Sequence, residues 1–397
     1  MTLRVRLSVK VALLGAVYAA LIVPIAPAPA GAQALPAFAS AAHKVPAYEL
    51  IGLPTLGGSQ GAANAVNETG WAVGSTYVAR NAALHAAWWA GKRTRDLGTL
   101  GGTNSNATAI NSAGTIAGYA ETSYPDPEGE LFCSASGLTC SATAWEGRRV
   151  VALPSLGGNN SAIFGMNAQE IAVGVAETAA YDGSCYGKQV RQISAALWHV
   201  RSGRVSELPP LPGDPDAVAH AINVWGNVAG GSGTCAQAEG FALPNHAVLW
   251  RHGKPQDLGN LGGSAAFAAA INDQNQVVGW ANLPGDAAYH AFLWHGGRMT
   301  DLGTLPGDIS SIATGINDEG QIVGASFDAS GGKRAFVCRH GKMVDLNSLV
   351  PPSGTLSVLQ ANAINSYGEI VGYAGDTQVR GHISGFLAIP TGSIRSF

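Results

Sequence analysis

Residues 270–279 read AINDQNQVVG, with a polar turn between two short apolar runs. The same arrangement recurs along the chain, because seven asparagines are each followed seven residues later by a glycine. The pairs are Asn67 and Gly74, Asn111 and Gly118, Asn167 and Gly174, Asn223 and Gly230, Asn272 and Gly279, Asn317 and Gly324, and Asn365 and Gly372. A fixed internal period of this kind is typical of a repeat architecture.

The third residue after each repeat asparagine indicates how each copy turns. It is glycine in five copies, Asn275 in one and Glu170 in another. Glycine and asparagine tolerate positive φ, so this spacing predicts a type I turn with a left-handed closing residue. The apolar runs on either side then pair as a β-hairpin. Glu170 is the exception to this pattern.

Each copy continues with two further strand patterns. The third strand ends in Trp89, Trp145, Trp198, Trp250 or Trp294 in the first five copies and in Cys338 or Ala388 in the last two. A fourth strand follows and carries two leucines three residues apart, such as Leu302 and Leu305. The chain also begins with a lone strand of this fourth type at residues 48–53, and its last copy has none.

The strand count predicts the overall fold. Seven sets of three strands and seven fourth strands pair completely only if residues 48–53 join the last set, which ends at residues 386–389. A ring achieves this and leaves few exposed strand edges. We therefore predict an all-β protein, a seven-bladed β-propeller of four-stranded antiparallel blades closed by the N-terminal strand. An open solenoid is the alternative.

The first residues have a separate character. Arg4, Arg6 and Lys10 precede an apolar run at residues 11–25, and a small-residue cleavage signal lies at residues 32–34. We interpret residues 1–34 as a signal peptide. An uncleaved anchor is the alternative, but the apolar run is shorter than the ~20 residues of a membrane span. Residues 35–46 form a short segment, residues 47–390 the propeller and residues 391–397 a C-terminal tail.

Charge limits the partners of the chain. Of the 23 Lys and Arg residues, the leader holds three and no acidic residue, which leaves 20 basic residues against 26 acidic ones and a net charge of −6. This balance disfavours nucleic-acid binding, which needs a positive surface. We expect a secreted or periplasmic monomer with no membrane span after cleavage and no cofactor.

The five cysteines fit an exported chain. We predict disulfides Cys133–Cys140 and Cys185–Cys235, although four cysteines permit three pairings. Cys338 takes the place of a core tryptophan and is expected to be a buried free thiol. No spacing typical of a zinc site is present.

Three neighbouring repeats carry enlarged loops on one face. From the repeat glycine to the end of the third strand, copies 2, 3 and 4 span 27, 24 and 20 residues, whereas the other copies span 14 to 16. Long loops on a rigid scaffold often hold the functional residues. Their candidate ligand-binding residues, an aromatic and acidic set suited to sugars, cations or a basic partner, are Tyr124, Asp126, Glu128, Glu130, Tyr181, Asp182, Tyr186 and Glu239. The alternative is a tolerated, solvated insertion.

Residues 126–130 could hold Ca²⁺ but have too few ligands for a recognised calcium loop.

Three segments resemble the HAF repeat of extracellular bacterial proteins, which is named after a His-Ala-Phe triplet. They are residues 301–305 (DLGTL), 270–273 (AIND) and 290–294 (HAFLW). The resemblance covers about residues 48 to 390 and implies an extracellular repeat protein without a catalytic motif to carry over. The triplet is intact only at residues 290–292, although His85 and His246 are retained. We expect these histidines to make local hydrogen bonds at a strand start.

The leading functional hypothesis is an exported binding or scaffold protein that recognises a glycan or protein ligand through the enlarged loops of blades 2 to 4. One alternative is a secreted glycan hydrolase or lyase with its acids around the central funnel, for which no catalytic residue is nominated. Another is an inert extracellular structural protein. Convergence of tyrosines and carboxylates into one pocket would favour binding or catalysis, and dispersal would favour the inert protein.

Overall fold

A computed structural model describes residues 47–185, 187–235, 246–351 and 355–391. The predicted leader (1–34), the segment 35–46, almost all of the C-terminal tail, and the candidate residues Tyr186 and Glu239 lie outside these ranges. The described residues form β-strands joined by turns and two short 3-10 helices, at Ala79–Asn81 and Leu346–Ser348. None of the helices in these ranges has the length and apolar character that a membrane crossing requires.

Each repeat has four kinds of strand, which we call first to fourth by their order within the repeat, and β1 is the fourth strand that pairs with the last repeat. The first strands are β2 (Gly57–Val66), β6 (Gly101–Ile110), β10 (Gly157–Met166), β14 (Asp216–Ile222), β18 (Ala266–Ile271), β22 (Ser310–Ile316) and β26 (Leu356–Ile364). The second strands are β3 (Trp71–Val78), β7 (Ile116–Pro125), β11 (Ile171–Tyr181), β15 (Val228–Gly233), β19 (Val277–Asn282), β23 (Ile322–Phe327) and β27 (Ile370–Asp376). The third strands are β4 (Leu84–Ala90), β8 (Leu138–Glu146), β12 (Arg191–His199), β16 (His246–Arg251), β20 (Tyr289–His295), β24 (Lys333–Arg339) and β28 (Ile383–Pro390). The fourth strands are β5 (Arg93–Asp96), β9 (Arg149–Ala152), β13 (Arg204–Leu208), β17 (Lys254–Asp257), β21 (Arg298–Asp301), β25 (Lys342–Asp345) and β1 (Tyr48–Leu53).

The strands pair in chain order. Five sheets have four antiparallel strands each, from β6-β7-β8-β9 to β22-β23-β24-β25. The remaining eight strands form one sheet, in which β26-β27-β28 and β2-β3-β4-β5 meet at a single parallel bridge between Gln60 and Ile383. The predicted pairing of the first strand with the last set is confirmed, because β1 runs antiparallel to β28 with Tyr48 opposite Pro390.

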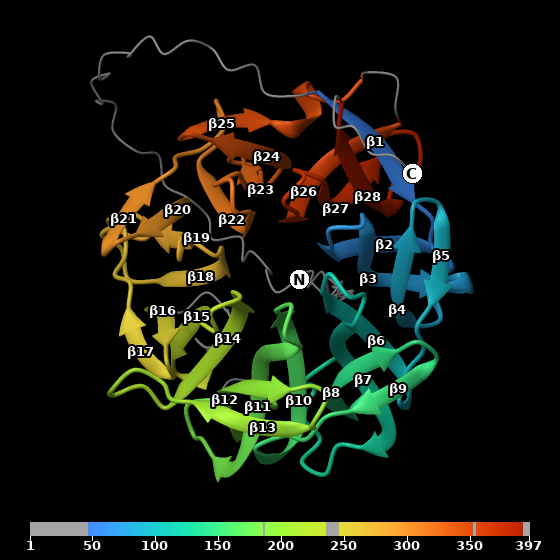
Figure 1. Ribbon diagram of the computed structural model, residues 1–397, viewed down its shortest axis with the longest axis vertical. Coiled ribbons are helices and arrows are strands. Elements are labelled where there is room, and N and C mark those ends of the chain that lie inside the picture. The colour runs from blue at the N-terminus through green and yellow to red at the C-terminus, as the bar shows by residue number, and fades with distance from the viewer. Residues whose placement is uncertain (1–46, 186, 236–245, 352–354, 392–397) are drawn as a thin grey trace, which may run out of the picture.

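The sheets stand side by side around a ring, with the first strands nearest the middle and the fourth strands at the rim (Figure 1). This radial arrangement of antiparallel sheets is that of a β-propeller. The hydrophobic core lies between neighbouring sheets. It also lies between the two halves of the eight-stranded sheet, where Leu53 of β1 and Val371 of β27 pack with Trp89 of β4. Its indole N–H donates to the carbonyl oxygen of Pro54 at 2.8 Å, so the buried ring has its polar atom satisfied.

The predicted hairpin turns are present. Gly70 donates its N–H to the carbonyl oxygen of Asn67 at 3.0 Å and has a φ of 76°. Glu170, the exception in the sequence, makes the same turn, with a φ of 59° and a 3.1 Å hydrogen bond to the carbonyl oxygen of Asn167. The side-chain Oδ1 of Asn67 accepts the N–H of Trp71, which explains why asparagine begins the turn.

The other end of the same side chain joins adjacent repeats. The Nδ2 of Asn67 donates to the carbonyl oxygen of Asn111 at 3.0 Å, and the corresponding bond recurs for five of the other repeat asparagines. In the described part of the chain the exception is Asn111, whose buried Nδ2 has no hydrogen-bond partner. The repeat asparagine therefore has two structural roles, one within its turn and one between sheets.

Candidate functional site

Two enlarged loops meet at the face where β7 leads to β8 and β11 leads to β12. The predicted disulfides are confirmed and brace this region. Cys133–Cys140 ties the β7–β8 loop to β8, and Cys185–Cys235 ties the β11–β12 loop to the end of β15, with Cα separations of 5.7 and 4.6 Å. Cys338 is free and buried, as expected, and burial raises its pKa to about 11.

Asp126 organises the β7–β8 loop. Its Oδ1 accepts the backbone N–H groups of Glu128 and Glu130, both at 2.9 Å. This tight turn places the three acidic side chains together, and one carboxylate oxygen of each lies within 4.8 Å of those of the other two. Such spacing resembles a cation site, but these oxygens also accept hydrogen bonds from the protein itself.

A buried amide lies among the carboxylates. Nδ2 of Asn160, at the start of β10, donates to Asp126 at 2.8 Å and to Glu177 of β11 at 3.0 Å, and it lies 3.3 Å from Glu130. Glu130 also accepts the N–H groups of Val190 and Arg191 at 2.8 and 3.0 Å. Burial, together with the neighbouring Glu177, raises the pKa of Glu130 to about 7 against the lowering effect of those two backbone bonds.

Arg191 supplies the positive charge of this cluster. Its Nε donates to Glu128 at 3.1 Å, and its terminal nitrogen forms a salt bridge with the same oxygen. The two side chains are only 15% and 17% exposed. The guanidinium also lies 5.0 Å from the centre of the Tyr181 ring, and Tyr181 donates its hydroxyl to Glu128 at 3.4 Å. The ion pair thus joins the β7–β8 loop to the start of β12 in the neighbouring sheet.

Four large side chains at the ends of β7 and β11 and in the loops that follow them remain exposed. Tyr124 and Tyr181 are 72% and 69% exposed, and Leu131 and Val190 are 42% and 37% exposed. We call these four residues the loop patch. Because Val190 donates its N–H to Glu130, next to Leu131, the two loops approach each other within this patch.

The structure therefore brings together four of the predicted site residues, Asp126, Glu128, Glu130 and Tyr181. The backbone N–H of Asp182 donates to the carbonyl oxygen of Val190 at 3.0 Å, but its side chain turns to other partners, Ser184 and Asp216. Burial alone would raise the pKa of Asp182, but its hydrogen bonds with Asp216 and Ser184 outweigh this and lower it. That any of these residues binds a ligand stays a prediction.

The sequence reasoning missed Glu177, Asn160 and Arg191. A signal for Glu177 existed, because it follows repeat glycine Gly174 by three residues, and Glu121 stands at the same place in the preceding repeat. The Glu121 carboxylate accepts the backbone N–H of Asn104, and the Glu177 carboxylate accepts that of Asn160, each at 2.9 Å and near the start of a first strand. A residue that departs from the repeat in two neighbouring copies thus marks where the loops are braced.

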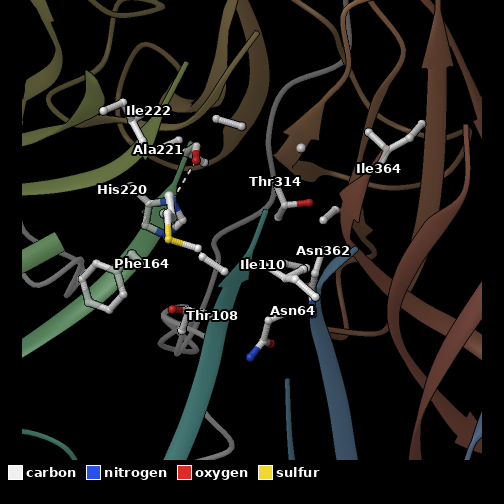
Figure 2. A pocket seen from close by; sticks show the side chains of 18 of the residues that line it. Asn64, Thr108, Ile110, Phe164, His220, Ala221, Ile222, Thr314, Asn362 and Ile364 are labelled. Atoms are coloured by element: carbon white, nitrogen blue, oxygen red, sulfur yellow. Dashed lines mark hydrogen bonds between the residues drawn. The ribbon is translucent and has the colours of Figure 1, made fainter. Parts of the chain in front are cut away.

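A second candidate site lies in the middle of the ring. A cavity of about 280 Å³ is lined by residues of all seven first strands (Figure 2). Each first strand has a β-bulge three residues before its repeat asparagine. The bulge residues all line the cavity and are Asn64, Thr108, Phe164, His220, Ala269, Thr314 and Asn362.

The repeat glycine makes room for the bulge. Gly74 pairs with Ala63, directly before the bulge residue, and a Cβ on Gly74 would lie 2.0 Å from the carbonyl oxygen of Ala62. The other six repeat glycines are similarly crowded by the first strand. A side chain at this position would push the first strand away, which explains why the glycine recurs.

None of the described residues that line the cavity is a carboxylate. The pair of carboxylates that a glycan hydrolase would need in the central funnel is not among these lining residues. The HAF-type histidines do not line the cavity either. His85 and His290 hydrogen-bond through Nδ1 to Asp96 and Asp301, both at 2.9 Å, so the expected local bonds are confirmed.

Comparison with known proteins concerns the fold alone. No family model matches the chain, and no curated protein sequence matches it. Among solved structures, it is similar to the β-propeller domain of the Trilobed protease from Pyrococcus furiosus, with 9% identity over 72% of this chain and 84% of that chain and a TM-score of 0.45. An oligogalacturonate lyase from Vibrio parahaemolyticus is 8% identical over 86% of this chain and 94% of that chain, with a TM-score of 0.48.

A structure from a study of two prolyl endopeptidases gives a TM-score of 0.50, with 8% identity over 84% of this chain. The match spans only 51% of that chain. The chain has a β-propeller fold. At these identities, the activities of the similar proteins do not transfer to it.

Proposed function

We propose that this chain is an exported, seven-bladed β-propeller that binds a glycan or protein ligand through its loop patch. One observation supports the blade count. The two halves of the eight-stranded sheet are joined by only one parallel bridge, between Gln60 and Ile383, so we count each half as a separate four-stranded blade. Together with the five other sheets they correspond to the seven repeat asparagines.

Export is supported by two independent features. The first 34 residues have the charge, apolar run and small residues of a signal peptide. The two disulfides, Cys133–Cys140 and Cys185–Cys235, are of the kind that persists in oxidising compartments outside the cytosol. Membership of the extracellular HAF-repeat proteins is part of the same proposal and rests on the repeat motifs.

The observation that carries the binding proposal is the loop patch itself. Its four large side chains are exposed at the ends of β7 and β11 and in the two loops that follow, and disulfides, a salt bridge and buried carboxylates brace these loops. Exposed tyrosines on a rigid frame bind with little loss of conformational entropy, because few torsions become ordered. Aromatic rings also provide flat apolar surface with a polar hydroxyl, which suits both sugar rings and protein partners.

The test is a binding screen of the full chain against a glycan array and against proteins secreted into serum-free medium. Each screen is performed with and without Ca²⁺. The decisive variant is Tyr124→Ala combined with Tyr181→Ala. Tyr367→Ala is the matched control, because Tyr367 is 56% exposed on a turn between first and second strands at the opposite face. Binding lost in the double variant and retained in the control would support the proposal. Binding that survives the double variant would contradict it.

A further inference from the structure

The bulge residues vary between repeats, with asparagine and threonine each occurring twice, whereas the residue after the bulge is always small. The residue after the bulge is alanine or glycine in all seven repeats, for example Ala65, Gly165 and Ala270. The bulge residue itself ranges from alanine to phenylalanine. The repeat thus keeps a uniform backbone frame and varies the side chain that lines the cavity at the bulge.

Hydrogen bonding between repeats uses the donors of these side chains. Thr108 donates its hydroxyl to the carbonyl oxygen of Ile163 in the next repeat at 2.6 Å, and Thr314 does the same to Ala361 at 2.6 Å. Asn64 donates through Nδ2 to the carbonyl oxygen of Ala107 at 3.0 Å and to Oδ1 of Asn106 at 2.8 Å. Since these donors are already bound within the protein, the oxygen lone pairs of the three side chains are what they can offer to a ligand.

His220 shows the same division most clearly. Its Nδ1 lies 2.7 Å from the carbonyl oxygen of Ala269, and because a carbonyl can only accept, Nδ1 carries the proton. Burial lowers the pKa of His220, so the ring is neutral and Nε2 is an acceptor. Phe164 stacks on the ring with 5.7 Å between ring centres, and the Phe267 ring lies T-shaped to it at 5.5 Å, so both rings restrict its orientation. No described residue donates to Nε2.

Aliphatic side chains complete the lining. Two residues beyond the bulges, Ile110, Ile222 and Ile364 border the same cavity (Figure 2). The cavity therefore offers hydrogen-bond acceptors beside apolar surface and, among its described lining residues, no formal charge. A charged ligand would lose its hydration there without gaining a partner of opposite charge. A molecule with both C–H surface and hydroxyl donors would be matched on both counts.

We propose that the central cavity binds a small, uncharged, hydroxyl-rich molecule, such as a monosaccharide or cyclic polyol, whose hydroxyls donate to Thr108, Thr314 and His220. The cavity volume of about 280 Å³ is near the lower end of the roughly 300–1,000 Å³ typical of ligand pockets, so a single sugar ring suits it better than a chain. This site is separate from the loop patch and does not depend on it.

The first experiment is calorimetric titration of the full chain with glucose, galactose and myo-inositol, each alone. Glucuronate and glucosamine serve as charged probes of similar size. At least one neutral probe is expected to bind, and its charged analogue is expected to bind at least about tenfold more weakly. If no neutral probe binds, the cavity holds only water and the proposal is wrong. Preferential binding of a charged probe would also overturn it.

Variants locate the binding. Thr108→Phe fills the cavity and should be tolerated, because phenylalanine already stands at the bulge of the third repeat as Phe164. It is expected to weaken binding at least about tenfold. Thr94→Val is the matched control, since Thr94 also donates to a backbone carbonyl, that of Pro54, but lies outside the cavity. Unchanged affinity in Thr108→Phe would place the ligand elsewhere.

A second variant keeps the test decisive if Thr108→Phe does not fold. His220→Phe retains an aromatic ring between Phe164 and Phe267 but has no nitrogen acceptor. Weaker binding of the neutral probe is expected, and unchanged binding would contradict the role of Nε2. The Tyr124→Ala and Tyr181→Ala double variant should bind the neutral probe like the wild type, which separates this proposal from the loop patch.

Discussion

Nδ2 of Asn365 donates to the carbonyl oxygen of Asn67 at 3.0 Å, across 298 residues of sequence. The same side-chain to backbone bond joins other neighbouring repeats. The last repeat is therefore linked to the first in the same way as repeats that are adjacent in sequence. Between the second and third repeats the bond is missing among the described residues, because Nδ2 of Asn111 has no acceptor. There Thr115 donates instead to Glu170 at 2.9 Å.

Asn67→Asp should destabilise the protein more than Asn111→Asp. Both asparagines are 4% exposed, and in both variants the aspartate keeps the oxygen that accepts the turn N–H. Only Asn67 loses a donor to a neighbouring carbonyl, and the new oxygen faces that carbonyl. We expect a difference of about 1–3 kcal/mol in the free energy of unfolding, measured by urea denaturation. Equal losses in the two variants would show that the link between repeats contributes no stability.

Arg191→Met should reduce stability by about 2 kcal/mol. The substitution leaves Glu128 charged and largely buried, and the partial exposure of the pair keeps the cost below the ~3–5 kcal/mol of fully buried pairs. The control is Arg149→Met, whose partner Glu146 is 4.0 Å away in an exposed pair. That variant should lose about 1 kcal/mol or less. A similar loss in both, by urea denaturation, would mean that the Glu128 pair is no more important than a surface pair.

The two disulfides should contribute unequally to stability. Cys185–Cys235 closes a span of 50 residues and Cys133–Cys140 a span of 7. The chain-entropy relation gives about 4 kcal/mol for the longer loop and about 2 kcal/mol for the shorter. Paired serine substitutions at each disulfide, compared by thermal and urea unfolding, are expected to follow this order. The reverse order would indicate that loop length does not govern their effects.

The acidic cluster should make stability depend on pH. The pKa of Glu130 is raised from 4.5 to about 7 in the folded protein, so between these values the folded state holds a proton that the unfolded state has lost. Stability from this group is therefore full below about pH 4.5 and falls as pH rises towards 7. Glu130→Gln cannot titrate and should lack this component. Urea midpoints of both proteins at four pH values between 4.5 and 7.5 test this, and parallel pH profiles would refute it.

Much of the fold was predictable because its causes are local. An asparagine whose Oδ1 caps a turn and a residue with positive φ three positions later specify a hairpin wherever they occur. Counting strands then predicted that β1 pairs with β28. The disulfide Cys185–Cys235 was predictable from the repeat frame, since both cysteines follow second strands of adjacent repeats.

The candidate sites were predictable only in part. Glu128 and Glu130 were selected as acidic loop residues, but Arg191 is 63 positions from Glu128 and belongs to another repeat. The repeat glycines were recognised by their spacing, yet the bulge that Gly74 permits, and the cavity that seven bulges surround, had no sign in the order of residues.

The chain order is thus sufficient for turns, strands and their pairing within a repeat, because hydrogen bonds between residues close in sequence decide them. Whether Thr108 and His220 face one cavity, or whether Asn160 lies between Asp126 and Glu177, depends on how far each sheet rotates around the ring. That rotation results from side-chain packing between neighbouring sheets and between the two halves of the eight-stranded sheet, where Trp89 packs against Leu53. Packing of this kind acts over the whole assembled fold, so the sites emerge only when the ring is complete.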